Sequence, residues 1–110
     1  MLVPLTPAVF HILIALGEGE KHGYAVMQEV ADRTDGKERM SPGTLYGSIK
    51  RMLADCLIEQ TESRPAPELD DERRRYYRLT AQGRRALHAE VQRYARVVAV
   101  AQDRDLLAPA

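Results

Sequence analysis

The sequence predicts a mainly α-helical protein with one small β-hairpin. Apolar residues recur at helical spacing in four segments, and Thr or Ser stands where three of these helices would begin. Two short runs that contain Leu, Ile and Tyr flank a polar, proline-containing gap at 63–72, as the two strands of a hairpin would. The length of 110 residues fits one domain with one hydrophobic core.

The composition favours a cytoplasmic protein. No apolar run approaches the roughly 20 residues of a membrane-spanning helix, so we expect no membrane partner. The N-terminus lacks the pattern of a secretory signal, and a single cysteine, Cys56, cannot form an internal disulfide.

The formal net charge of zero conceals an uneven distribution of charge. Residues 1–72 hold 7 Lys and Arg against 13 Asp and Glu, whereas residues 73–110 hold 9 against 3. A basic patch can still attract phosphate, because salt screens acidic groups that lie more than about 8–10 Å away. Charge alone leaves two interpretations open, a nucleic-acid surface and a solvated arginine-rich surface.

The first helix is expected to begin with Thr6 as the N-cap and Pro7 at the first helical position. One apolar stripe faces its own domain, and Phe10 with Ile14 forms a second apolar face that a partner subunit would cover. Gly17 and Gly19 end this helix. The first stripe consists of Val9, Ile12, Leu13 and Leu16.

The second and third helices are expected to be joined by a short loop, as in a helix-turn-helix. The second runs from about His22 to Arg33, and its predicted buried stripe is Tyr24, Met27, Val30 and Ala31. A turn at 34–37 follows. Ser41 then caps the third helix, with Pro42 at its first position.

The third helix is expected to present a small, polar and basic outer face. Its buried side is Leu45, Ile49, Met52 and Leu53; the opposite side is Gly43, Gly47, Lys50, Arg51 and Ala54, flanked by Thr44 and Ser48. Small residues let a helix approach base edges closely, and polar or basic side chains contact groove and phosphates. An ordinary surface helix is the alternative, but each exposed interior glycine would cost it roughly 1 kcal/mol.

Strands are expected over 57–62 and 73–79, with one of the adjacent tyrosines of the second strand facing the core. Thr80 then caps the last helix. Its apolar residues recur at spacings of 4, 3, 4 and 3, which is a heptad seam and predicts a dimerisation helix with Phe10 and Ile14 as contact residues. The alternative is that this helix packs back on its own domain. The seam is Leu87, Val91, Tyr94, Val98 and Ala101.

These motifs together resemble the PadR family of bacterial transcriptional regulators. They are Gly-Thr-Leu-Tyr at 43–46, Leu-Ile at 57–58, Arg-Arg-Tyr-Tyr-Arg-Leu-Thr-Ala-Gln-Gly at 74–83, and His-Gly-Tyr at 22–24. The resemblance covers roughly residues 5–87. Two positions depart from the family pattern: Gly47 stands where members usually carry proline, and Cys56 stands where they usually carry a helix-ending glycine, often with positive φ.

The resemblance implies a winged helix-turn-helix domain over 1–79 and a C-terminal dimerisation helix over 80–110. It also implies a homodimeric repressor that binds double-stranded DNA at a pseudo-palindromic operator. The implied DNA-binding residues are Tyr24, Ser41, Thr44, Tyr46, Ser48, Lys50, Arg51 and, on the wing, Arg73, Arg74 and Arg75.

Other functions fit the sequence less well. The three histidines lie in separate segments without metal-ligand spacing, so we expect no metal or cofactor and no enzyme. A thiol enzyme or a redox sensor would depend on Cys56 alone. The family likeness implies a small lipophilic or aromatic effector, for which Phe10 and Tyr94 are candidate lining, although plain dimer core is the favoured role of both. The main alternative function is a winged-helix protein-interaction module without DNA binding.

Overall fold

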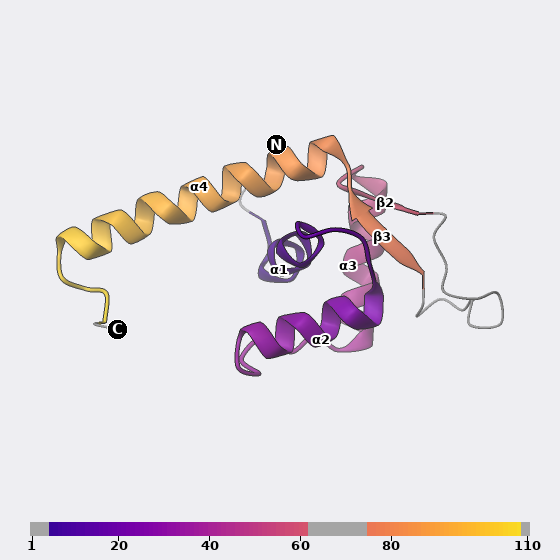
Figure 1. Cartoon of the computed structure of the whole chain (residues 1–110), viewed down its shortest axis with the longest axis horizontal. Helices are drawn as coiled ribbons and strands as arrows, with labels where there is room; N and C mark the ends of the chain where they lie inside the picture. The colour runs from indigo at the N-terminus through magenta and orange to yellow at the C-terminus, as the bar shows by residue number, and fades with distance from the viewer. Residues whose placement is uncertain (1–4, 62–74, 109–110) are drawn as a thin grey trace.

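The computed structural model describes residues 5–61 and 75–108, which fold into four helices and a small antiparallel sheet (Figure 1). The mainly helical fold with a hairpin is confirmed. The elements in chain order are α1 (Pro7–Leu16), β1 (Lys21–His22), α2 (Gly23–Arg33), α3 (Pro42–Ala54), β2 (Ile58–Gln60), β3 (Tyr76–Leu79) and α4 (Ala81–Asp103).

The sheet has three strands in the order β1-β3-β2, one more than the predicted hairpin. β2 pairs with β3 over Ile58–Gln60, and the two-residue β1 pairs with the other edge of β3. Within the described residues, both hairpin strands are shorter than expected. Residues 62–74, including the predicted DNA-binding residues Arg73 and Arg74, lie outside the described part of the chain. Sequence reasoning missed β1, because a strand of two polar residues has no alternation to detect.

Hydroxyl side chains cap three of the helices as predicted. Thr6, Ser41 and Thr80 each accept a hydrogen bond from the backbone N–H three residues later, at 3.2, 3.1 and 2.9 Å. Each cap is worth about 1 kcal/mol of stability. The N-cap of α2 is His22, whose Nδ1 accepts from the Ala25 N–H at 3.1 Å, so this helix begins one residue later than expected.

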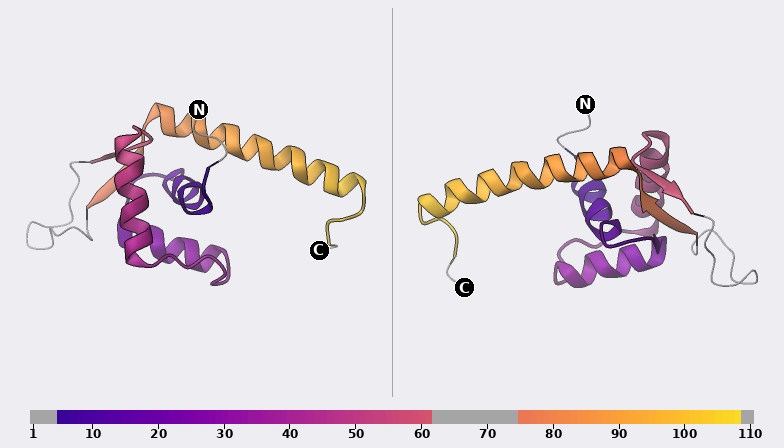
Figure 2. Two further views of the ribbon diagram at one scale, coloured as in Figure 1. Left: turned by 180° about the vertical axis from the view of Figure 1, so that it is seen from behind. Right: turned by 45° about the horizontal axis from the view of Figure 1, so that its top comes forward.

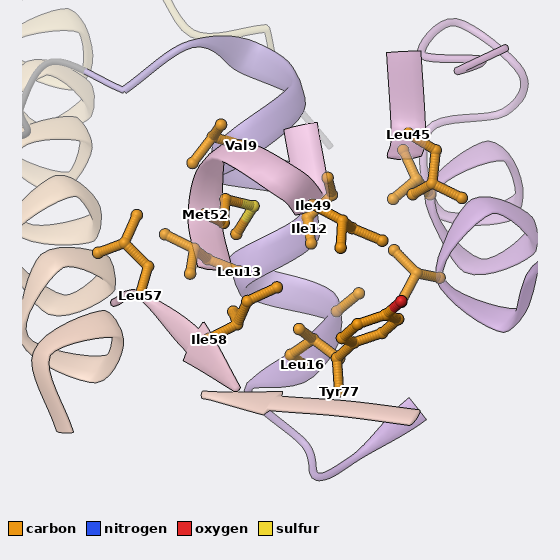
Figure 3. Close-up of a cluster of buried hydrophobic side chains, with 13 residues drawn as sticks. Val9, Ile12, Leu13, Leu16, Leu45, Ile49, Met52, Leu57, Ile58 and Tyr77 are labelled. Atoms are coloured by element: carbon orange, nitrogen blue, oxygen red, sulfur yellow. The ribbon is translucent and has the colours of Figure 1, made fainter. Parts of the chain in front are cut away.

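The core lies where α1 packs against α2, α3 and the sheet (Figure 3). The predicted stripes of α1 and α3 are buried apart from Leu53, and Tyr77 is the strand tyrosine that faces the core. Two predictions were wrong: Tyr24 is 54% exposed and Leu53 is 36% exposed. In α2 the predicted Val30 is buried and the predicted Met27 and Ala31 are half-buried. The other buried positions are Gly23 and Val26, because the helix turns its glycine toward α3.

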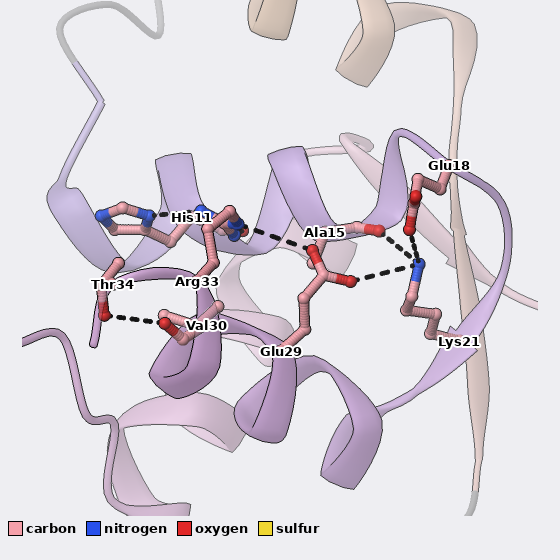
Figure 4. Close-up of polar contacts among 8 residues, drawn as sticks. All are labelled: His11, Ala15, Glu18, Lys21, Glu29, Val30, Arg33 and Thr34. Atoms are coloured by element: carbon pink, nitrogen blue, oxygen red, sulfur yellow. Dashed lines mark hydrogen bonds and ion pairs between the residues drawn. The ribbon is translucent and has the colours of Figure 1, made fainter. Parts of the chain in front are cut away.

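A polar network on the surface ties α1 to β1 and α2 (Figure 4). The Arg33 guanidinium donates to the His11 carbonyl oxygen at 3.2 Å and lies 3.7 Å from the Glu29 carboxylate. Glu29 also pairs with Lys21, whose ammonium donates to the Ala15 carbonyl at 2.8 Å. These bonds help to hold the second helix in place before the loop that leads to α3.

The longest helix, α4, extends past the rest of the fold (Figures 1 and 2). Its first half contacts α1 and β3, and its second half projects away from the end of the molecule that carries α3 and the hairpin. The described chain measures 54 × 30 × 22 Å as a result. Among the described residues, no helix is long and apolar enough to cross a membrane.

Candidate nucleic-acid interface

The outer face of α3 is exposed, small and basic. Gly43 and Gly47 carry no side chain, and Lys50 and Arg51 follow Gly47 by one turn on the same face. All four are exposed, and neither cation forms an ion pair with a described residue. By contrast, Arg78 on the hairpin is held by Glu59 at 2.7 Å. The face of α3 therefore presents two glycines and two cations that form no ion pair within residues 5–61 and 75–108.

The first turn of α3 adds oriented hydroxyl groups. Ser41 accepts from the Thr44 N–H and donates its own hydrogen to Thr44 Oγ1 at 3.2 Å. Because Thr44 Oγ1 accepts that hydrogen, its own O–H is left to donate to an acceptor outside the chain. Both residues are exposed. Pro42 has no N–H, and the N–H groups of Thr44 and Leu45 already donate to Ser41, so this turn offers a phosphate oxygen the Gly43 amide and the Thr44 hydroxyl group.

The remaining predicted DNA-binding residues of α2 and α3 differ in how far they are exposed to solvent. Tyr24 stands out from α2 near the start of the helix, whereas Ser48 is half-buried on the flank of α3. Tyr46 is also half-buried, and its ring lies 3.0 Å from the place where a Gly23 side chain would begin. Tyr46 thus packs α3 against the start of α2, and any contact it makes with DNA stays a prediction.

The hairpin is joined to α3 by a tight turn at Cys56. Cys56 has φ of +60°, the conformation expected for the glycine that it replaces, and the Leu57 N–H donates to the Met52 carbonyl at 2.9 Å. Thr80 donates its hydroxyl hydrogen to the Cys56 carbonyl at 2.6 Å. The end of α3, the hairpin and the start of α4 therefore meet at one junction. Arg75, on the hairpin side, is exposed.

The seam of α4 divides into two parts. Leu87 is half-buried against the core, and the Tyr94 ring lies 4.9 Å from the ring of Phe10 in the same chain. From Val91 to Val98 the seam is exposed to a similar degree: Val91 and Tyr94 are 42% exposed and Val98 is 43% exposed, and Val97 beside the seam is 57% exposed. Ile14 and Ala101 are half-buried, and Val91 is exposed. For these residues and the rest of the seam, a role in a dimer interface stays a prediction.

A buried carboxylate fixes the middle of α4 to the N-terminal segment, and sequence reasoning missed it. Glu90 Oε2 accepts from the Leu5 N–H at 2.9 Å, and Oε1 accepts from Arg93 Nε at 2.8 Å. The hydrogen bond from Arg93, followed by that from the Leu5 N–H, lowers the pKa of the Glu90 carboxyl from its ordinary value, against the opposing effect of burial. A glutamate three residues before an arginine on a helix looks like an ordinary surface ion pair. The local sequence therefore does not indicate that Glu90 is buried.

Comparison with proteins of similar sequence assigns the chain to one protein family. The chain matches the transcriptional regulator PadR-like family over residues 12–89. It is 40% identical over 77 residues to a transcriptional regulator of Mycobacterium tuberculosis, covering 70% of this chain and 65% of that protein. It is also 34% identical over 86 residues to an uncharacterized transposon protein of Streptomyces fradiae, covering 78% of this chain and only 22% of that longer protein.

Solved structures agree in fold. A PadR family transcription regulator from Clostridium difficile superposes with a TM-score of 0.72 and 27% identity, covering 89% of this chain and 97% of that one. Bacillus subtilis PadR in complex with operator DNA has the same fold, with a TM-score of 0.68, 20% identity, and coverage of 80% and 48%. Since the family match spans well over half of the sequence, the chain belongs to the PadR-like family of transcriptional regulators, which are not enzymes.

Proposed function

We propose that this regulator is a sequence-specific repressor that binds DNA as a homodimer through α3. The observation that carries the proposal is the outer face of α3, where Lys50 and Arg51 have no acidic partner among the described residues. Exposed Arg84, Arg85 and Arg96 on α4 also lack an ion pair with a described residue, so what distinguishes α3 is that its two cations lie beside the glycines Gly43 and Gly47. A helix with exposed cations beside positions that carry no side chain fits entry into the major groove.

In this proposal the helix and the hairpin have separate tasks. Thr44, Ser48, Lys50 and Arg51 face the groove, whereas Tyr24 and Ser41 lie against the sugar-phosphate backbone. Arg73, Arg74 and Arg75 form the basic side of the wing. The Bacillus subtilis relative in complex with operator DNA supports a DNA partner for the shared fold. Because the partner is DNA, we place the protein in the cytoplasm.

The proposed dimer is held by α4. Residues 1–79 form the DNA-binding domain and 80–110 the dimerisation helix. Support comes from the exposed valines beyond Tyr94, because a projecting helix with an apolar stripe is marginal in water unless a partner covers it. A two-fold axis between the α4 helices gives a pseudo-palindromic operator with half-sites about 34–36 Å apart, or a multiple of that distance.

Repression follows if the operator overlaps a promoter, and an effector would release it. We propose a small lipophilic or aromatic effector that binds beside Phe10 and Tyr94, whose rings already lie together in the free chain. Such a ligand acts by favouring a dimer in which the two α3 helices no longer match the half-sites.

The test of DNA binding starts with selection of preferred duplexes from a randomised pool by the wild-type protein. Affinity for the selected duplex and for a scrambled one is then measured across a salt series. Lys50→Ala/Arg51→Ala should weaken binding and reduce the slope of log affinity against log salt by about 0.9 for each phosphate that is no longer neutralised. The matched control is Arg96→Ala, which removes an exposed cation from α4 and should leave the slope unchanged.

Failure to select any preferred sequence, or an unchanged slope in the double variant, would refute the proposal and favour a protein-interaction module. The dimer is tested separately by sedimentation. Val98→Glu places a charge on the exposed part of the seam and should convert a dimer into a monomer, whereas Gln92→Glu adds the same charge at an exposed position off the seam and should not. A monomeric wild type would refute the dimer.

A further inference from the structure

A hollow of about 120 Å³ lies between α2 and the loop that leads to α3. The chain after α2 runs back alongside that helix before α3 begins, so α2 forms one wall of the hollow and the loop forms the other (Figures 1 and 2). One bound water needs only about 10–15 Å³, so the hollow has room for part of a larger ligand. Its lining is Tyr24, Met27, Gln28, Ala31, Arg39 and Met40.

The polar side chains of this lining come from both walls and have no partner inside the fold. Tyr24 and Gln28 lie one turn apart on α2, and Arg39 belongs to the loop. All three are exposed, and none forms a hydrogen bond or an ion pair with another residue of 5–61 or 75–108. Elsewhere on α2, Glu29 and Arg33 are both paired. The hollow therefore gathers polar groups that are left to bind something else.

The turn before Arg39 holds its guanidinium in place. Gly36 has a φ of +78°, and a side chain at that position would begin 3.3 Å from Nε and from Nη2 of Arg39. The guanidinium therefore rests against the bare Cα of Gly36. Neither Asp35 nor Glu38, the acidic residues of the same loop, forms an ion pair with it. A cation that is already held in this way loses less side-chain entropy when it binds an anion.

The chemistry of the lining indicates the ligand. The half-buried lining residues Met27, Ala31 and Met40 are apolar, whereas the exposed ones carry the polar groups. The guanidinium of Arg39 and the phenol hydroxyl of Tyr24 can both donate hydrogen bonds to an anionic oxygen. A sugar-phosphate backbone presents such oxygens next to the apolar face of a sugar, so it matches both parts of the lining.

The hollow also lies next to the proposed phosphate-facing end of α3. Arg39 precedes the cap residue Ser41 by two positions, so their Cα atoms are at most about 7 Å apart. Phosphates of one DNA strand follow one another about every 3.4 Å along the helix axis. A strand that meets the Gly43 amide and the Thr44 hydroxyl group can therefore offer a neighbouring phosphate to the hollow.

We infer that this hollow is a phosphate clamp, which binds one backbone phosphate of the DNA through Arg39, Tyr24 and Gln28, with the adjoining deoxyribose against its apolar lining. The inference rests on the proposed function and deepens it, because it adds Arg39 and Gln28 to the DNA contacts. The clamp carries no sequence information of its own. It fixes the position of α2 on the duplex and, through the loop, that of α3.

The experiment measures affinity for the duplex selected by the wild-type protein and for a scrambled duplex, across a salt series. Arg39→Ala should weaken binding to both duplexes by the same factor of about ten, the scale of one hydrogen bond to a charged group. It should also lower the slope of log affinity against log salt by about 0.9, whereas Arg39→Lys, which keeps the charge, should preserve the slope. The matched control is Lys37→Ala, which removes an exposed cation of the same loop that does not line the hollow and should leave the slope unchanged.

A double variant tests whether Tyr24 and Arg39 bind the same phosphate. Tyr24→Phe removes only a hydroxyl group, so it should weaken binding without a change of slope. In the Arg39→Ala background the same change should have a smaller effect, because the phosphate is no longer held in the hollow. Unfolding midpoints without DNA should equal that of wild type, since neither side chain is hydrogen-bonded within the described part of the chain.

Each alternative result has a distinct meaning. If wild type binds neither duplex, the proposed function fails and the phosphate clamp fails with it. If wild type prefers its selected duplex but Arg39→Ala keeps the wild-type slope, only the clamp is refuted. It is also refuted if Lys37→Ala lowers the slope as much, since any cation of the loop would then suffice. A loss of affinity confined to the selected duplex would indicate a base contact instead, and a lower unfolding midpoint of Arg39→Ala would assign Arg39 to the fold; either result overturns the inference.

Discussion

Replacing Gly83 by alanine tests how the start of α4 is attached to the rest of the fold. Gly83 is buried in the first turn of α4, directly against Leu57, which lies between α3 and β2. A Cβ atom at this position would overlap the Leu57 carbonyl oxygen and lie 2.9 Å from its carbonyl carbon. Both atoms belong to the backbone, so no rotamer change can make room. The helix and the strand must move apart.

The size of the effect follows from the bonds at the same junction. The Thr80 N–H donates to the Leu57 carbonyl at 3.1 Å, and the single hydroxyl hydrogen of Thr80 is shared between the Cys56 carbonyl at 2.6 Å and the Leu57 carbonyl at 3.1 Å. Moving α4 outward weakens these two donors' bonds, at about 1 kcal/mol each. Alanine returns up to about 1 kcal/mol through its higher helix propensity. We therefore expect a net loss of at least about 1 kcal/mol, which lowers Tm by roughly 5 °C or more in a domain of this size.

The assay is thermal and urea unfolding of Gly83→Ala beside Gly47→Ala, at one protein concentration because a dimer's stability depends on concentration. The chemical change is identical in the two variants, and both sites are in helices. Expected effects have opposite sign: Gly83→Ala is destabilised, and Gly47→Ala is stabilised. A Gly83→Ala protein within about 0.5 kcal/mol of wild type would refute the reasoning, since surface substitutions without structural consequence fall in that range.

Two further predictions concern single contacts. Ser41→Ala removes the N-cap of α3 and should cost about 1 kcal/mol of stability. Ser41→Asp keeps a capping oxygen, so it should preserve stability but weaken DNA binding through its negative charge. If Ser41→Asp binds DNA as tightly as wild type, Ser41 lies away from the phosphates. The lowered pKa of the Glu90 carboxyl means that its stabilising contribution is complete above the ordinary value of 4.5 and is lost as pH falls through the lower folded-state value. Glu90→Gln should thus be less stable than wild type at pH 7, with a difference in urea unfolding that shrinks on acidification; a difference independent of pH would contradict this.

The features that the sequence predicts well are local. Thr6, Ser41 and Thr80 cap their helices because a side-chain oxygen and an N–H three residues later are sufficient for a cap. The apolar stripes of α1 and α3 follow from helical periodicity. The positive φ of Cys56 agrees with what the family resemblance implied for this position, where members usually carry a helix-ending glycine. Each of these depends on residues within one or two turns of each other.

The features that the sequence did not predict depend on distant contacts. Tyr24 looked buried by its spacing, but the Tyr46 ring lies over Gly23 and sets which side of α2 faces inward. Glu90 is buried because the Leu5 N–H, 85 residues earlier, needs an acceptor. The collision that requires glycine at position 83 involves a strand from another part of the fold. No pattern in a single segment contains this information.

The contacts along α4 explain how a change at the dimer helix would reach the DNA. The start of α4 is fixed to the end of α3 through Thr80 and Gly83, and its middle is fixed to the N-terminal segment and α1 through Glu90 and Tyr94. A helix held at two separated places cannot pivot freely on the domain. In the proposed dimer, the angle between the two α4 helices therefore determines the distance between the two α3 helices. The effector that we propose would alter this angle and so change operator affinity without contact with α3.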